Sequence, residues 1–220
     1  MTRTEKANPS CSECGTLNCD RRQSMFPQFC LTQSGDQQEM ESAVRSYAGS
    51  DADGLIARAA AEVEGRYYGK LTRVEEIIAF ANLLGAKAIG IATCAGLIQE
   101  CGAFVKVLRR QGLQPYTAVC KVGAIDKTEI GLPEALKIVP GSHESICNPI
   151  YQAKTLNTRK TELNVMVGLC VGHDSLFSKY SEAPVTTLIA KDRVLAHNPA
   201  AALYTINSYY KRLLAADRKL

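Results

Sequence analysis

The stretch AKAIGIATC, residues 86–94, decides the fold. Apart from Lys87 it consists of small and apolar residues, without the alternation of apolar and polar positions that marks a half-exposed strand. A short continuous apolar run of this kind is typical of a strand in a parallel sheet, where helices cover both faces. The run ends at Cys94.

The residues before this strand have the pattern of an amphipathic helix. Between Lys70 and Leu84, apolar residues recur at the i, i+3, i+4, i+7 spacing. Thr72 and Glu75 have the spacing of a capping box, and Gly85 is a typical helix stop. We therefore predict a helix over residues 70–84 that leads into the strand.

Strands and helices alternate along the rest of the chain. We predict further strands over 116–122, 163–171 and 185–190, and helices over 96–111, 148–157, 174–180 and 199–214. Residues 36–64 have a helical pattern that we expect to be broken at Gly49 and Gly54. This alternation predicts βαβ units, and hence an α/β fold with a mostly parallel sheet and helices on both faces.

The composition is that of an ordinary globular protein. The chain has 220 residues, of which 46% are hydrophobic and 22% charged. A net charge of +4, with no run of more than two Lys or Arg residues, disfavours a nucleic-acid partner. No apolar run reaches the roughly 18 residues of a membrane span. The first residues, MTRTEK, lack the apolar core of a signal peptide. We therefore expect a cytoplasmic protein without a membrane partner.

The N-terminal residues are organised around cysteine. Four of the nine cysteines have the spacing C-x2-C-x4-C-x10-C: Cys11, Cys14, Cys19 and Cys30. A segment this short cannot bury enough apolar surface to fold unaided, and a metal or disulfides usually supply the stability. An odd number of cysteines and a reducing compartment disfavour disulfides. We therefore predict a Cys-rich metal-binding segment over residues 1–34 and an α/β domain over residues 35–220.

The spacing leaves two metal centres open. Cys11-x2-Cys14 followed by Gly15 is similar to a zinc knuckle. The C-x2-C-x4-C pattern also resembles the segment that binds a [4Fe–4S] cluster in proteins such as the corrinoid iron–sulfur protein, although the last gap is usually longer there. Thiolates bind both zinc and a [4Fe–4S] cluster, and spacing alone does not separate them.

Four other cysteines fall at or near the boundaries of predicted elements, namely Cys94, Cys120, Cys147 and Cys170. The carboxyl ends of parallel strands form the ligand crevice of an open α/β sheet, so we predict a second thiol site there. The alternative for each thiol is packing, because free cysteine often behaves as a small buried hydrophobe. For Cys101, within a predicted helix, packing is the preferred interpretation.

The segment GLCVGHDS, residues 168–175, is the most suggestive part of this second site. A thiol beside the N-terminus of a helix has its thiolate stabilised by the helix dipole, which applies to Cys170. His173 could serve as a base or ligand. Asp174 could orient His173, although a role as helix cap is favoured.

Several charged residues and the other histidines have weaker signals. Glu100, Lys121 and Lys191 lie near the ends of predicted strands, and the two lysines could bind an acidic ligand, although all three are more simply explained as solvated charges. His143 could complete a site with Cys147, but it and His197 are expected in loops.

These motifs resemble, as a set, a family of uncharacterised prokaryotic predicted metal-binding proteins with a Cys-rich N-terminus. The resemblance is carried by the N-terminal C-x2-C-x4-C segment and by four motifs: IGIATC (89–94), VCK (119–121), CVGHDSLF (170–177) and APVT (183–186). It covers nearly the whole chain. It implies metal binding through the cysteines and a cytoplasmic location, and it supplies no reaction.

The leading hypothesis is a cytoplasmic metal-binding protein. Its N-terminal four-cysteine site would hold zinc or an iron–sulfur cluster, and the second site, with Cys170, His173, Cys94, Cys120 and Cys147 as candidate catalytic residues, would handle redox, thiol or metal chemistry. A redox partner or a small-molecule ligand would then be needed. The first alternative is a non-catalytic sensor or carrier of a metal or small ligand with a structural zinc. A small-molecule enzyme whose sheet cysteines only pack is the second.

Overall fold

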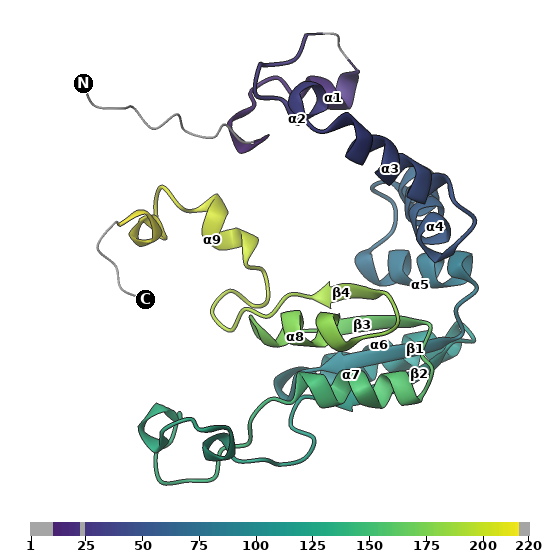
Figure 1. Ribbon diagram of the computed structural model, residues 1–220. Helices are drawn as coiled ribbons and strands as arrows, with labels where there is room; N and C mark the ends of the chain where they lie inside the picture. Colours follow the sequence, from purple (N-terminus) through teal and green to yellow (C-terminus); the bar gives the residue numbers. More distant parts are fainter. Residues whose placement is uncertain (1–10, 23–24, 216–220) are drawn as a thin grey trace. The chain divides into compact units, whose positions relative to one another are not determined.

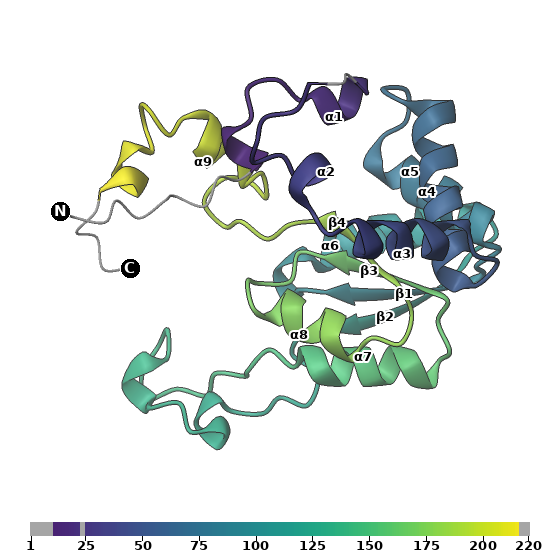
Figure 2. The same ribbon diagram turned by 45° about the horizontal axis from the view of Figure 1, so that its top comes forward.

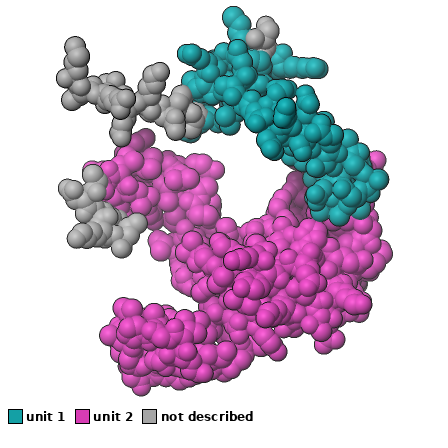
Figure 3. Space-filling view, viewed as in Figure 1, with its two compact units in different colours: residues 1–61 teal, residues 62–220 magenta. Residues whose placement is uncertain are grey.

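Figure 1 shows the computed structural model of the chain, in which residues 11–22 and 25–215 are described. The chain divides into two compact units, residues 1–61 and 62–220, which are coloured separately in Figure 3 and are described here one at a time. None of the helices in the described residues is both long and apolar enough to cross a membrane.

The larger unit is built on a parallel sheet of four strands in the order β2-β1-β3-β4. The strands are β1 (Ala88–Thr93), β2 (Gln114–Val119), β3 (Leu163–Val167) and β4 (Val185–Ile189). The predicted α/β class is thus confirmed, and each predicted strand is present, with shifts of a few residues at its ends. Every residue of β1 after the first is buried, as its uninterrupted apolar sequence predicts.

Helices cover both faces of this sheet (Figure 1 and Figure 2). The helices α5 (Arg73–Leu84) and α6 (Ile98–Arg110) pack on one face, against the side chains that alternate along β1 and β3. On the opposite face lie α7 (Pro149–Thr158) and α8 (His173–Tyr180), which contribute Leu156 and Phe177 to a second apolar cluster. Strand positions one residue apart therefore serve different cores, because successive side chains of a strand point to opposite faces.

The second core requires a glycine in the middle of β1. A Cβ atom at Gly90 would lie 1.9 Å from Asn164 Oδ1 and 2.9 Å from Leu156 Cδ1, so no side chain fits there. Asn164 is fully buried, yet its amide is paired: Nδ2 donates to Ser181 Oγ at 2.7 Å, and Oδ1 accepts from Thr161 Oγ1 at 2.8 Å. The close approach thus lets α7 and a satisfied polar group share this face of the sheet.

The predicted capping box and glycine stop of α5 are confirmed, although the helix begins at Arg73 and not at Lys70. Thr72 and Glu75 form a reciprocal capping box, in which the Thr72 N–H donates to Glu75 Oε2 at 2.8 Å. The same hydrogen bonds lower the pKa of Glu75. Gly85 ends the helix in the left-handed conformation, with φ of 71°.

Three predictions about helices are wrong. Gly54 does not break a helix, because it lies in the first turn of α4 (Ala52–Tyr67). Backbone N–H groups in a first turn have no helical acceptor, and the Gly54 N–H donates instead to Asp51 Oδ1 at 3.1 Å. The expected helix over 199–214 is reduced to α9 (Ala200–Tyr204) and a 3-10 turn over Lys211–Leu214. Asp174 is not the cap of α8, since Gly172 holds that position.

The smaller unit contains the predicted Cys-rich segment. Its elements are a 3-10 turn (Cys11–Glu13), α1 (Asn18–Arg21), α2 (Leu31–Ser34), α3 (Gln37–Ala48) and the first part of α4. Asp36 caps α3 by accepting from Gln38 N at 2.9 Å and Glu39 N at 3.3 Å. The predicted break at Gly49 is confirmed, because this glycine follows the last residue of α3.

An irregular segment, residues 122–146, joins β2 to α7 and contains 3-10 turns at Lys127–Ile130 and Glu134–Leu136. Charged side chains hold it together. The ammonium of Lys137 lies 2.8 Å from Asp126 and 2.9 Å from Glu134, and these pairings lower the pKa of both carboxyl groups. In Figure 1 this segment and α9 both extend from the end of the sheet to which the strand arrows point.

Candidate functional site

Backbone hydrogen bonds bring three of the sheet cysteines together beyond the carboxyl ends of the strands. Cys94 directly follows β1, and its N–H donates to Val167 O of β3 at 3.1 Å. Cys120 directly follows β2, and its N–H donates to Thr93 O at 2.8 Å. The carbonyl of Cys120 in turn accepts from Asn148 N at 2.7 Å, which brings Cys147 back to the same place. These three thiols belong to the second core cluster, where Cys147 is half-buried.

Cys120 and Cys147 form a hydrogen-bonded dithiol. This bond lowers the pKa of Cys147 to about 5, helped by the positive charges of Lys121 and His173 and opposed by burial. The pKa of Cys120 is raised, first by the bond to Cys147 and then by burial. Cys120 is only 2% exposed, and its sulfur accepts from Ala95 N at 3.3 Å. The opposite directions of the two pKa shifts favour Cys147 as the thiol of the pair that ionises first.

The other two thiols each receive a hydrogen bond from a cation. Lys191 Nζ lies 3.3 Å from Cys94 Sγ, and Arg193 Nη2 lies 2.9 Å from Cys170 Sγ. The contact with Cys170 raises the pKa of Arg193. Both cations lie in the segment that follows β4, two residues apart in the sequence. The end of β4 is held beside the chain that leads to Cys170, because Gly168 N donates to Ile189 O at 2.9 Å.

Cys94 and Cys170 flank the point at which the strand order of the sheet reverses, between β1 and β3. Ligands of open α/β sheets bind at this position. The turn that carries Cys170 there depends on Gly168, which has φ of 71°. A Cβ atom at Gly168 would lie 1.9 Å from Leu97 Cδ1, so the turn also needs the absence of a side chain.

His173 opens α8, and its backbone N–H donates to Cys170 O at 2.9 Å. Its Nδ1 atom is buried and has no hydrogen-bond partner among the described residues. Asp174 does not supply one, because its Oδ1 atom accepts from Ser175 N at 2.8 Å. The imidazole therefore contributes charge to the Cys147 thiolate when it is protonated, without a carboxylate to orient it.

The structure thus joins most of the residues that the sequence singles out. Cys101 instead packs in the first core cluster, where burial raises its pKa, as the packing interpretation predicts. His143 pairs with Ser145 at 2.9 Å and lies 3.3 Å from Asp126, so it belongs to the ionic network of the 122–146 segment. Glu100 is exposed. His197 accepts from Asp192 N at 3.2 Å and shapes the turn after β4.

Sequence reasoning missed Arg193. The available signal is its position two residues after Lys191, because side chains two apart on an extended segment point to the same side. The expectation that Lys121 and Lys191 are solvated charges is wrong, because both are half-buried, and Lys121 donates to Ser145 O and Lys191 to Cys94 Sγ.

The N-terminal cysteines are placed on separate short elements. Cys11 lies in the first 3-10 turn, Cys19 in α1, and Cys30 at the cap of α2. The Cys14 sulfur lies 3.5 Å from Thr16 Oγ1, and this contact lowers the pKa of Cys14. Over residues 11–22 and 25–215, no three Cys, His, Asp or Glu side chains are arranged so that they could hold a metal ion. As placed, the four thiols do not make a coordination shell, and zinc or iron–sulfur binding stays a prediction.

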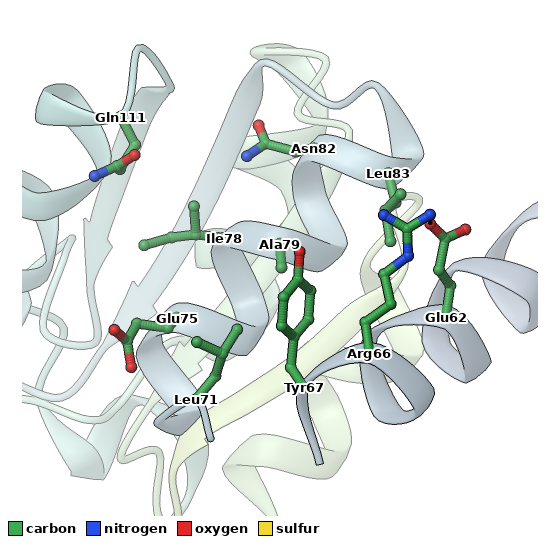
Figure 4. Close-up of a pocket in the computed structure, with 10 residues that line it drawn as sticks. All are labelled: Glu62, Arg66, Tyr67, Leu71, Glu75, Ile78, Ala79, Asn82, Leu83 and Gln111. Atoms are coloured by element: carbon green, nitrogen blue, oxygen red, sulfur yellow. Dashed lines mark ion pairs between the residues drawn. The ribbon is translucent and has the colours of Figure 1, made fainter. Parts of the chain in front are cut away.

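A groove of about 390 Å³ lies elsewhere on the larger unit (Figure 4). It is formed by the end of α4, by α5 and by Gln111. Gln111 follows α6 and precedes β2, so the groove lies near the amino ends of the strands, opposite to the thiols. Its apolar wall includes Leu71 and Ile78, and its charged groups are already paired, as in the 2.7 Å contact between Arg66 and Glu62. No nucleophile or metal ligand other than carboxylates lines it, so the thiol site is the better functional candidate.

Residues 30–188 match the family described as "Protein of unknown function (DUF1847)". The chain is also similar to the uncharacterized protein MJ0455 of Methanocaldococcus jannaschii, with 50% identity over 159 residues, which are 72% of this chain and 80% of that protein. No solved structure matches the chain. The matched range includes the four sheet cysteines and ends before Lys191 and Arg193.

Proposed function

This chain belongs to the DUF1847 family of proteins of unknown function, and we propose that it acts through the Cys120–Cys147 dithiol at the carboxyl edge of its sheet. The observation that carries the proposal is the arrangement of this pair: two interacting thiols, one buried, the other half-buried beside the cation Lys121. Such a pair has the nucleophile and the resolving thiol that thiol–disulfide exchange requires.

The proposed reaction is the reduction of a substrate disulfide. The Cys147 thiolate attacks one sulfur, which forms a mixed disulfide and releases the other sulfur as a thiolate. Cys120 then passes its proton to a departing thiolate and attacks Cys147, so that the second substrate sulfur leaves and a Cys120–Cys147 disulfide forms. The substrate gains two electrons and one proton from the protein, and the second product thiolate takes its proton from water. A cellular thiol or an iron–sulfur donor would restore the dithiol.

The aromatic disulfide dithiobis(nitrobenzoate) tests this step on the reduced, full-length chain. We expect release of two aromatic thiols per chain in a fast phase, and a Cys120–Cys147 cross-link in the peptide map. In the Cys120→Ser variant, Cys147 should instead retain the aromatic group as a stable mixed disulfide. A Cys101→Ser variant, which alters only a packed thiol, should behave as the wild type. A fast phase at other cysteines, or no cross-link, refutes the proposal.

We propose in addition that the N-terminal cysteines bind zinc or a [4Fe–4S] cluster, supported by the spacing of Cys11, Cys14, Cys19 and Cys30. Nine free thiols are consistent with a reducing cytoplasm, which we propose as the location.

Elemental analysis of the anaerobically purified chain tests metal binding by the N-terminal cysteines. We expect zinc, or iron with sulfide, in the wild type and a loss in Cys11→Ser but not in Cys101→Ser. Equal metal content in both variants contradicts the proposal. A zinc-containing chain without an active dithiol would instead support a non-catalytic carrier or sensor.

A further inference from the structure

Within the part of the chain that the structure describes, three cations of the thiol site have no carboxylate partner. Lys121, Lys191 and Arg193 take part in none of the ion pairs within 4.0 Å that the described residues form. Their hydrogen bonds go to a backbone carbonyl and to the sulfurs of Cys94, Cys147 and Cys170. Sulfur is a weak acceptor, so these bonds leave most of the hydrogen-bonding capacity of the cations unused.

The neighbouring 122–146 segment shows that unpaired cations are not general in this part of the chain. There, Lys137 contacts both Asp126 and Glu134, and Lys127 contacts Glu144. The acids nearest in sequence to the site are used locally. Asp192 accepts from Val194 N and Leu195 N, each at 2.8 Å. The charge of Lys121 contributes to the lowered pKa of Glu144, but the ion pair of Glu144 is with Lys127.

The site therefore presents three cations that no carboxylate within 4.0 Å pairs with among the described residues. Lys121 and Arg193 each interact electrostatically with Cys147, Lys191 contacts the neighbouring Cys94, and a protonated His173 would add a fourth charge. Lys121 and Lys191 are half-buried, where a charge interacts more strongly with a ligand than it would in bulk water. Two of the cations lie on one short segment and reach the thiols on either side of the point where the strand order reverses.

We infer that the thiol site selects an anionic substrate, one that places a carboxylate or another oxyanion beside the group attacked by Cys147. This inference rests on the proposed function, because it assumes that Cys147 is the attacking group. In it, Lys191 and Arg193 are specificity-determining residues that bind the oxyanion and leave the thiols when it arrives. Their guanidinium and ammonium groups are the usual partners of carboxylates and phosphates.

Two alkylating reagents that differ in charge test the inference. Iodoacetate and iodoacetamide transfer their carbon to a thiolate by the same displacement of iodide, and only iodoacetate is anionic. The rate of each at Cys147 is measured by peptide mapping of the folded, full-length chain at low salt. We expect the ratio of the iodoacetate rate to the iodoacetamide rate to be higher at Cys147 than in the urea-unfolded chain, and to fall as salt is added.

Matched variants assign the effect to the named cations. Arg193→Gln and Lys191→Gln should each lower the ratio about fivefold or more, the effect of removing one charge near the reacting group. Arg193→Lys should keep most of the wild-type rate ratio, because the positive charge is retained. Lys154→Gln, which removes an exposed charge from α7, should leave the ratio unchanged.

The outcomes separate the inference from the proposed function. A ratio that is the same in the wild type, Arg193→Gln and Lys191→Gln, with Cys147 still fast toward iodoacetamide, overturns the inference and leaves the dithiol proposal standing. The cations would then serve only to stabilise the Cys94 and Cys170 thiols. If Cys147 reacts with neither reagent in the folded chain, the proposed function fails and the inference fails with it.

Discussion

Cys147 should react as a thiolate at a pH where an ordinary cysteine is almost fully protonated. The bond from Cys120 and the charges of Lys121 and His173 lower its pKa from 9.0 to about 5. At pH 6, about 90% of Cys147 is then ionised, against about 0.1% of a thiol with the usual pKa. The pH dependence of its alkylation therefore tests the geometry of the site directly.

The expected gain in rate is smaller than the gain in ionisation. A thiolate of lower pKa is intrinsically less nucleophilic, and a difference of four units costs roughly 40- to 100-fold in rate per thiolate. At pH 6 the ionised fraction outweighs this loss, so Cys147 should react about 10- to 20-fold faster than an ordinary cysteine. At pH 7 the two effects almost cancel, and the difference should be at most about threefold.

The assay is the rate of iodoacetamide addition at Cys147, followed by peptide mass spectrometry from pH 4 to pH 9. We expect a rate that is nearly constant above pH 6 and falls below pH 5. Cys120→Ala should shift the profile to higher pH, because the main stabilising hydrogen bond is lost, and Cys120→Ser should shift it less, because a hydroxyl can still donate. A rate that rises tenfold per pH unit between pH 6 and pH 8 would refute the reasoning, since it is the profile of an ordinary thiol.

Three predictions concern the scaffold, and the free energy of unfolding measured in urea checks each. Gly168→Ala should destabilise the chain more than Gly112→Ala, by about 1–3 kcal/mol, because both glycines have positive φ but only at Gly168 would a methyl group overlap a neighbouring leucine; equal losses would contradict this. Phe177→Ala should cost about 3–5 kcal/mol and Leu176→Ala, at an exposed position, below about 1 kcal/mol; similar costs would mean that Phe177 is not in the core. Thr72→Ala should cost about 1 kcal/mol and Thr72→Ser much less, since serine keeps the cap of α5; a full loss with serine would exclude the capping explanation.

The sheet could be predicted because its signal is local. Residues 86–94 are apolar without alternation, and a strand buried on both faces needs that composition. The expected helix over 199–214 fails for a reason that is also physical. After Tyr204 the chain continues with Thr205 and Ile206, whose branched side chains disfavour a helix, and Thr205 Oγ1 bonds back to Ala201 O at 2.7 Å. Spacing of apolar residues alone overestimates a helix that has no buried face.

The meeting of the thiols could be predicted in outline and not in detail. Carboxyl ends of parallel strands share one edge of a sheet, so the sequence predicts Cys94, Cys120, Cys147 and Cys170 near that edge, although only the first, second and fourth follow from strand ends. The contact between Cys120 and Cys147 could not be predicted in this way, because the irregular segment 122–146 separates the two residues. Their contact depends on an ionic network and on the Asn148–Cys120 backbone bond, neither of which has a periodic signal in the sequence.

Packing alone does not account for the composition of this edge. Cys101 shows what a packed cysteine looks like in this chain: it is buried among apolar side chains, burial raises its pKa, and no cation contacts it in the described residues. Cys94 and Cys170 at the strand ends instead each accept a hydrogen bond from a cation. Partial burial of Lys121 and Lys191 beside weak acceptors costs solvation free energy that an apolar residue would not cost. A cost of this kind is typical of sites where charge is used, because there a thiolate or an incoming anion compensates it.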